Sequence, residues 1–271
     1  MIKQAIIPLA GLGTRLLPIT SVLPKELLPI NGKPGLEYIL DECLEAGIKQ
    51  IILIISSKKK IIKKYFYNDV FFQKRIKEKK NDKRLKSEYL KIKKFKKMIK
   101  FVYQNSPRGT GDAILKCQKL IKSEYFLMLL PDDLIIKNNC SLAMLKLHKK
   151  YKLSIIASKK VKTKNVSRWG IFSLKKFQKN NFWIKDVIEK PSVKFAPSNY
   201  AVIGRYILPT KIFKILKKQK PGQNGEIHIT DAIRQLIYKK NKFIGHVFAG
   251  KYLDCGTMKG YINSTIEVSK L

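Results

Sequence analysis

Short apolar runs rich in β-branched residues alternate with helical patterns along this chain of 271 residues. Such alternation is typical of doubly wound α/β sheets and disfavours β-sandwiches and helical bundles. The apolar runs predict strands at 4–9, 50–55, 99–103, 125–130, 153–157, 170–174, 182–188, 202–208 and 243–249. The helical patterns predict helices at 35–46, 58–66, 111–121, 139–150, 209–218, 230–240 and 257–269. We therefore expect an α/β fold with a Rossmann-like, mixed but mostly parallel central sheet flanked by helices.

Two helical segments carry more specific expectations. Thr230 is a favourable N-cap residue and Asp231 suits a first helical turn, so we expect the sixth helix to begin there. The lysine-dense segment 68–98 is predicted to be helical and exposed. Because no repeat or long flexible linker divides the chain, we expect a single domain whose second half continues the same sheet.

The formal net charge of +38 first suggests a nucleic-acid partner. Lysine supplies most of this charge, however, and the chain is also rich in isoleucine and asparagine, a combination that AT-rich codons produce. We interpret basic runs such as 58–64 and 91–97 as solvated helix faces and do not expect nucleic-acid binding. The charge favours anionic phosphate substrates.

Cysteine spacing and hydropathy indicate the compartment in which the protein is expected to reside. Cys43, Cys117, Cys140 and Cys255 form no CxxC pair and no zinc-like pattern with the three histidines, which indicates a reducing cytoplasm. The longest apolar stretches fall far short of the roughly 20 residues of a membrane span. The apolar N-terminus is predicted to be a first buried strand instead of a secretion signal.

A glycine-rich segment, AGLGTR (10–15), directly follows this first predicted strand, where open α/β sheets bind their ligands. Gly11 and Gly13 let backbone N–H groups approach phosphate oxygens, and Arg15 adds a cation suited to bidentate contacts. A dinucleotide fingerprint would need glycine at Leu16, and a P-loop would need GK[ST], which is absent. The loop therefore indicates a phosphate site of another kind.

A proline-punctuated segment, PKELLPI (24–30), follows ten residues after Arg15. Its prolines prevent a regular helix, so Lys25 is predicted to be held on a stiff support.

These two motifs, GxGTRLxP and then PKExLP, resemble those of the sugar nucleotidyltransferases. Later segments match in order the bacterial UTP–glucose-1-phosphate uridylyltransferase branch: YQNSPRGTGDAI (103–114), LLPDDLI (129–135), WGIF (169–172), VIEKPS (187–192), APSNYAVIGRY (196–206), GEIHITDAI (225–233) and YLDCGT (252–257). The resemblance covers nearly the whole chain. It implies a nucleotide-binding half at about 1–135, a sugar-phosphate-binding half at about 136–256 and a C-terminal helix at about 257–271 of one domain.

The resemblance implies transfer of a uridylyl group from UTP to glucose 1-phosphate with release of pyrophosphate. The attacking phosphate oxygen is already ionised at neutral pH, so we expect positioning and charge neutralisation in place of a general base. We accordingly expect no catalytic role for His148, His228 or His246.

Site residues are assigned by the same resemblance. Those implied to bind the nucleotide are Ala10, Gly11, Gly13, Thr14, Gln104 and Gly109. Those implied to bind the sugar phosphate are Gly170, Glu189, Lys190 and Val202, while Arg15, Lys25 and Lys190 are implied to be catalytic. The side-chain amide of Gln104 both donates and accepts, which suits the edge of uracil.

Mg²⁺ is the expected cofactor, because it prefers a few carboxylates together with substrate phosphates and water. Asp132 and Asp254 are the implied ligands. Asp132 follows the C-terminal end of a buried strand and Asp254 lies near the end of a later one, so we expect both to face one crevice. The adjacent Asp133 ranks below Asp132.

Three departures from the family pattern leave alternatives open. Trp169 stands where a tyrosine or another residue commonly precedes the glycine, Asp112 stands where histidine is frequent, and the chain stops soon after its last predicted helix. A homo-oligomer, dimer or tetramer, stays open, as does transfer from dTTP or another triphosphate. A more distant alternative is a non-catalytic protein that binds nucleic acid or other anions.

Overall fold

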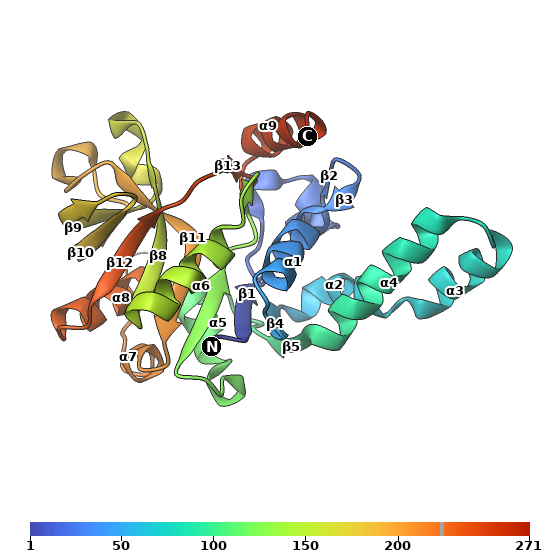
Figure 1. Ribbon diagram of the computed structural model, residues 1–271, viewed down its shortest axis with the longest axis horizontal. Helices are drawn as coiled ribbons and strands as arrows, with labels where there is room; N and C mark the ends of the chain where they lie inside the picture. The colour runs from blue at the N-terminus through green and yellow to red at the C-terminus, as the bar shows by residue number, and fades with distance from the viewer. Residues whose placement is uncertain (223–224) are drawn as a thin grey trace.

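The computed structural model describes residues 1–222 and 225–271, and within them a nine-stranded sheet forms the centre of the molecule (Figure 1). The strands of this sheet are β1 (Gln4–Pro8), β4 (Gln50–Ile55), β5 (Ile99–Tyr103), β6 (Tyr125–Leu129), β8 (Ser154–Lys160), β9 (Gly170–Gln178), β10 (Asn181–Glu189), β11 (Tyr200–Pro209) and β12 (Phe243–Val247). Their spatial order is β5-β4-β1-β6-β11-β8-β12-β10-β9, with a further pairing of β11 with β9. Each predicted strand is thereby confirmed, with ends shifted by a few residues.

Strand direction confirms the expected fold class. β5, β4, β1 and β6 are parallel neighbours, and β12 is parallel to β8. Among the described strands of the sheet, only β10 and β11 run against the others. The mixed pairing closes the second half of the chain onto the first half as one continuous sheet.

Helices cover both faces of the sheet. They are α1 (Gly35–Glu45), α2 (Lys60–Tyr67), α3 (Asp69–Glu78), α4 (Lys83–Met98), α5 (Thr110–Leu115), α6 (Cys140–Tyr151), α7 (Ile212–Leu216), α8 (Ile229–Tyr238) and α9 (Met258–Ser269). Alternate residues of β1 enter different cores: Ala5 and Ile7 pack with α1, α2, α4, α6 and α9, whereas Ile6 packs with α5, α7 and α8. This period-2 alternation places β1 at the buried centre of the sheet.

The predicted helices are confirmed in place, although α5 and α7 are shorter than expected. The prediction that Thr230 caps the sixth helix is wrong. α8 begins at Ile229 after His228, without a side-chain cap, and the backbone N–H of Ile229 donates to the hydroxyl of Thr110 (3.3 Å) from α5. A tertiary partner thus replaces the local cap, while Asp231 lies in the first turn as predicted.

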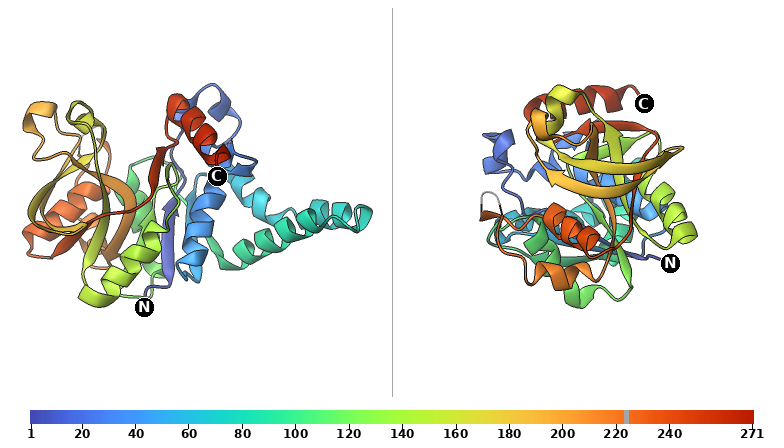
Figure 2. Two further views of the ribbon diagram at one scale, coloured as in Figure 1. Left: turned by 45° about the horizontal axis from the view of Figure 1, so that its top comes forward. Right: turned by 90° about the vertical axis from the view of Figure 1, so that its left-hand side faces the viewer.

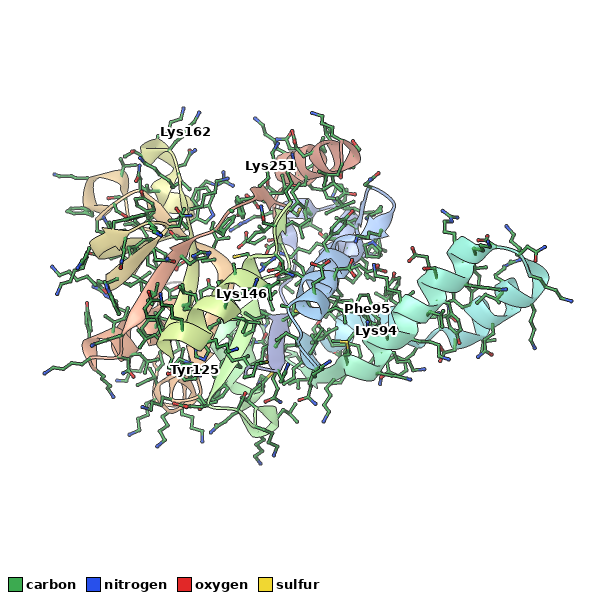
Figure 3. All side chains as sticks on the ribbon, in the orientation of Figure 1. Lys94, Phe95, Tyr125, Lys146, Lys162 and Lys251 are labelled. Carbon is green, nitrogen blue, oxygen red and sulfur yellow. The ribbon has the colours of Figure 1, made fainter. Side chains whose placement is uncertain are left out.

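The lysine-dense segment forms a helical arm. α3 and α4 lie side by side and project from the body of the molecule, as the views in Figures 1 and 2 agree. At the base of the arm, Ile92 and Phe95 of α4 are buried, whereas the neighbouring Lys94 is exposed (Figure 3). The expectation of an exposed helical segment is therefore confirmed. None of the described helices combines the length and apolar character needed to cross a membrane.

Four short strands were not predicted from the sequence. β2 (Pro29–Ile30) pairs with β3 (Lys33–Pro34), and β7 (Asp133–Ile136) pairs antiparallel with β13 (Lys251–Asp254). Strands of two to four residues are too short to produce a recognisable alternation. The pairing of β7 with β13 joins positions about half the chain apart and ties the C-terminal segment to the centre of the sheet.

A buried ion pair stabilises the contact between α1, α6 and β11. The fully buried guanidinium of Arg205 donates to both carboxylate oxygens of Glu42 at 2.8–3.0 Å, and Ser141 donates to Glu42 from its backbone N–H (3.0 Å) and its hydroxyl (2.5 Å). Burial by itself would lower the pKa of Arg205. The charge of Glu42 and its hydrogen bonds outweigh this effect and raise the pKa. The Arg205 guanidinium therefore stays charged in the core beside the Glu42 carboxylate.

We expect Glu42→Ala to lower the free energy of unfolding by about 3–5 kcal/mol, because it leaves a buried guanidinium without a counter-charge. Urea denaturation followed by circular dichroism measures this loss. Glu78→Ala is the matched control, since it breaks the exposed Arg75–Glu78 pair and is expected to cost under about 1 kcal/mol. Equal losses in the two variants would contradict this role of the buried pair.

Candidate functional site

The loops that follow β1 and β6 face each other across a cleft of about 420 Å³. β1 and β6 are adjacent parallel strands, yet the chain visits β4 and β5 on the other side of β1 before it reaches β6. This reversal is a topological switch point, where open α/β sheets bind ligands. We call this hollow the β1–β6 cleft; the predicted residues that line it are Ala10, Gly11, Gly13, Thr14, Lys25, Gln104, Gly109 and Asp132.

The two glycines of the first loop have different reasons to be glycine. Gly13 has a φ of 73°, and a Cβ there would lie 3.3 Å from Thr20, whose hydroxyl donates to the Gly13 carbonyl (2.9 Å). A Cβ on Gly11 would meet no described protein atom within 4 Å. Internal packing therefore explains Gly13, whereas the open space at Gly11 leaves backbone accessible to a ligand. Arg15 is exposed and does not line the cleft, although its positive charge reaches Asp132.

Lys25 lies opposite this loop, at the start of a short 3-10 helix, Lys25–Leu27. Its amine donates to Asp132 Oδ2 at 2.7 Å, and Asp132 lies just beyond the end of β6. Burial alone would raise the pKa of Asp132, but the charge and hydrogen bond of Lys25 outweigh it and lower this pKa. The carboxylate is therefore ionised, and it neutralises a lysine aimed into the cleft.

A second, buried lysine supports the Lys25 segment. The Lys59 amine donates to both oxygens of Glu26 at 2.9 Å and to the carbonyl of Leu9 at 2.7 Å. One side chain thus joins the segment of Lys25 to the beginning of the glycine loop. The interpretation of the run 58–64 as a solvated face is wrong for Lys59, which is only 8% exposed. Nothing in a run of three lysines distinguishes the buried one.

Asp254 is brought beside Asp132 by the pairing of β7 with β13. A Cβ built on Gly256 would lie 3.0 Å from Asp132 Oδ2 and 3.2 Å from Asp254 Oδ1, so the two carboxylates flank one glycine. The Arg168 guanidinium donates to Asp254 Oδ2 at 2.7 Å. Sequence reasoning missed Arg168, because its partner lies 86 residues away.

The donor chemistry at this point fits a divalent cation completed by substrate. In the part of the chain that the structure describes, no group of three or more His, Cys, Asp or Glu side chains is placed to hold a metal ion. Two carboxylates are nevertheless what Mg²⁺ takes from a protein when phosphates and water supply its other ligands. Lys25 and Arg168 currently balance the charge of Asp132 and Asp254.

Asp133 turns away from this pair of carboxylates. It accepts hydrogen bonds from the Gly204 backbone N–H (2.8 Å) and the Tyr252 hydroxyl (2.6 Å). Burial and the adjacent Asp132 carboxylate raise the pKa of Asp133 to about 6. A Cβ on Gly204 would lie 2.5 Å from Asp133 Oδ2, so this packing requires glycine. Asp133 therefore holds β11 and β13 in position.

The predicted sugar-phosphate residues gather on β9, β10 and β11. A Cβ on Gly170 would lie 3.2 Å from Val202 and 3.3 Å from Glu189 Oε2. Lys190 follows with a φ of 44°, and its exposed amine is 3.8 Å from Glu189 Oε1. Burial, then the charges of Asp133 and Glu189, raise the pKa of Tyr206, which places this buried residue within electrostatic range of both groups.

Gln104 and Gly109 form the far wall of the cleft. Gln104 directly follows β5 and is 4% exposed, and its amide nitrogen donates to the Gly109 carbonyl at 3.2 Å. Gly109 has a φ of 94°, and a Cβ there would lie 2.6 Å from the Ile227 carbonyl oxygen. Backbone conformation and close approach both require glycine at this position. Glu226 also lines the cleft here and was missed, because its segment is distant in sequence.

The histidines have structural settings. His148 lies on α6 with Nδ1 2.8 Å from the Leu153 carbonyl, and His246 lies on β12 with Nδ1 2.8 Å from Asn181. His228 precedes α8, 3.8 Å from Glu226. None of the three is a lining residue of the β1–β6 cleft.

Comparisons with known proteins agree on one family. A family model described as nucleotidyl transferase matches residues 4–270. UTP–glucose-1-phosphate uridylyltransferases from Pseudomonas aeruginosa and Bacillus subtilis are each 36% identical to this chain over 98% of its length, which corresponds to 95% and 90% of those proteins. A solved UDP-glucose pyrophosphorylase complexed with UDP-glucose is 38% identical, with a TM-score of 0.86 over 100% of this chain and 99% of that one.

We expect Lys59→Met to lower the free energy of unfolding by about 3–5 kcal/mol, because the Glu26 carboxylate, 1% exposed, loses its counter-ion. Urea denaturation measures the change. Lys58→Met and Lys60→Met are matched controls from the same run, and since both lysines are exposed we expect changes within about 0.5 kcal/mol. A loss at Lys59 no larger than in these controls would refute its anchoring role.

Proposed function

Because the chain belongs to the nucleotidyl transferase family, we propose that it transfers a uridylyl group from UTP to glucose 1-phosphate, forming UDP-glucose and pyrophosphate. One observation carries this proposal: Lys25 and an accessible glycine loop face the Asp132–Asp254 carboxylates across the switch point of the sheet. Such a site suits two polyanionic substrates and a cation between them. The relatives that are named for this reaction, and the solved relative that binds UDP-glucose, support the choice of uridylyl transfer.

In the proposed reaction an oxygen of the sugar phosphate attacks the α-phosphorus of UTP. A new phosphorus–oxygen bond forms, the bond between the α-phosphorus and the bridging oxygen breaks, and pyrophosphate leaves with that electron pair. The nucleophile is ionised at neutral pH, so no proton has to be removed. Catalysis then depends on orientation and on neutralising charge between the two anions.

The residues of the cleft supply these two effects. Backbone N–H groups at Gly11 and Gly13 bind the triphosphate, with Ala10 and Thr14 beside them. Lys25 exchanges its contact with Asp132 for a phosphate oxygen, and Arg15 contributes positive charge from the rim. Gln104 and Gly109 receive the base.

The second substrate binds on β9, β10 and β11 in this proposal. Lys190 neutralises the sugar phosphate, Glu189 accepts hydrogen bonds from sugar hydroxyls, and Gly170 and Val202 shape the sugar pocket. These positions follow the division into a nucleotide-binding half, about 1–135, and a sugar-phosphate-binding half, about 136–256. The C-terminal helix, about 257–271, completes the same domain.

Asp132 and Asp254 hold Mg²⁺ in this proposal. The bound ion supplies electrostatic stabilisation to the phosphate oxygens. Lys25 and Arg168, which now pair with these two carboxylates, would then be free to contact the phosphates.

We also propose a cytoplasmic location. Each of the four cysteines, all within the described residues, is free and buried, which suits a reducing compartment.

The direct test is Mg²⁺-dependent release of pyrophosphate from glucose 1-phosphate with UTP, dTTP, ATP and GTP compared side by side. We expect turnover with UTP to exceed that with ATP or GTP by at least about a hundredfold, because a site built around pyrimidine hydrogen bonds leaves them unpaired with purines. EDTA is expected to abolish the reaction. Absence of pyrophosphate release with every triphosphate would refute the proposal, and a preference for dTTP would change the nucleotide assigned.

We expect Asp132→Asn to reduce kcat by about a hundredfold or more, because the isosteric amide removes a negative charge from the cation site. The same pyrophosphate assay gives the rate, and far-UV circular dichroism reports whether the fold is retained. Asp41→Asn, which alters a carboxylate on α1 that pairs with Lys33 and Lys91, is the control and is expected to retain activity. A folded Asp132→Asn variant with activity within tenfold of the wild type would exclude Asp132 from the cation site.

A further inference from the structure

The side-chain amide of Gln104 has a defined orientation at the wall of the β1–β6 cleft. Its backbone is held where β5 ends, because the Gln104 N–H donates to the Ile55 carbonyl at the end of β4 (2.9 Å). Its side chain lines the cleft and is nearly buried. The direction of the amide therefore decides which hydrogen-bonding group a bound base meets.

Two partners settle this direction, and both of them only accept hydrogen bonds. Gln104 Nε2 is 2.7 Å from Asp112 Oδ2 and 3.2 Å from the Gly109 carbonyl oxygen. The carboxylate oxygen and the backbone carbonyl oxygen act as acceptors, so both face the NH₂ end of the amide. The two N–H groups of Gln104 are thereby used within the protein, and Oε1 is the end that meets a ligand.

We propose that Asp112 is a positioning residue that sets nucleobase specificity by holding Gln104 with its carbonyl oxygen toward the base. This inference rests on the proposed function of the cleft. A carbonyl oxygen at this place accepts a hydrogen bond from the ring N–H of uracil or thymine. Cytosine has a ring nitrogen acceptor at the equivalent position, so two acceptors face each other and binding is disfavoured. In this proposal Gln104 contacts the base only as a hydrogen-bond acceptor. The sequence had suggested that its amide both donates to the base and accepts from it.

Asp112 is itself fixed by the segment that precedes α8. In α5, the Gly111 N–H donates to the Ile227 carbonyl (2.7 Å), and the Ile227 N–H donates to the Arg108 carbonyl (2.8 Å). A Cβ on Gly111 would lie 2.8 Å from the side chain of Ile227, so the two segments are in close contact. This clamp holds the first turn of α5, and with it the Asp112 carboxylate, against Gln104.

A second charged group lies on the outer side of Asp112. The half-exposed Lys116 amine is 3.7 Å from Asp112 Oδ2, one helical turn further along the chain. It partly balances the carboxylate charge and is not a lining residue of the cleft. Lys116 therefore provides a variant that alters the surroundings of Asp112 without altering Gln104.

The test compares UTP with CTP in Asp112→Asn, an isosteric change that gives position 112 both a donor and an acceptor. Calorimetry gives the affinity for each nucleotide without sugar phosphate, and the pyrophosphate assay gives kcat/KM. Because only the Gly109 carbonyl then opposes the reversed orientation of the Gln104 amide, we expect the preference for UTP over CTP to fall by about tenfold or more. Asp112→Glu keeps an acceptor and is expected to restore much of the preference, while Lys116→Met is expected to leave it unchanged.

Each outcome bears on a separate claim. An unchanged UTP/CTP ratio in folded Asp112→Asn would overturn the positioning role, even though wild-type activity with UTP would leave the proposed function standing. An equal loss of affinity for both nucleotides would also overturn it, since that result indicates general damage to the cleft. If the wild type binds neither nucleotide, the proposed function fails first. Should Asp112→Asn not fold, the same ratio measured in Asp112→Ala decides.

Discussion

The antiparallel pairing of β7 with β13 is the contact on which the candidate site depends. Each strand has four residues, and the register places Asp254 opposite Asp133. The backbone N–H of Cys255 then donates to the Asp132 carbonyl (2.8 Å), which holds the two segments together beyond the strand ends. Without this pairing, the Asp132 and Asp254 carboxylates would belong to distant parts of the chain. With it, they flank a single glycine at the switch point of the sheet.

Charge compensation is the second principle of the site. Lys25 pairs with Asp132, Arg168 with Asp254, and Lys59 with Glu26. The first pair lines the cleft, and the second lies beside it at the end of β13. The third is buried and anchors both the glycine loop and the segment of Lys25. Two partly exposed pairs at the site thus accompany a buried pair that fixes the backbone of the Lys25 segment.

Much of the fold was predictable because hydrophobic periodicity is a local signal. The strands of the main sheet and the long helices were expected in their correct places, and the mixed, mostly parallel sheet followed from their alternation. Errors fell where a distant partner replaced a local one. The Thr110 hydroxyl accepts the hydrogen bond from the first residue of α8, where Thr230 was expected to be the cap. Lys59 is buried because it pairs with Glu26, although its lysine-rich run predicts a solvent-exposed face. The sequence did not predict the short strands β2, β3, β7 and β13, because strands of two to four residues show no recognisable alternation of apolar and polar residues.

The sequence by itself determined which chemical groups are present and where many of them lie along the chain. The glycine loop directly after the first strand, Lys25 between prolines, and aspartates at strand ends indicated a site for phosphates, and the order of the motifs indicated the family. Only the tertiary structure decided which of these groups meet. It brought Arg168 to Asp254 and Asp254 beside Asp132, buried Lys59, and joined the Gln104 amide to Asp112. The physical reason is range: periodicity and motif spacing describe neighbours along the chain, whereas ion pairs and amide orientation depend on partners that only folding brings within 3 Å.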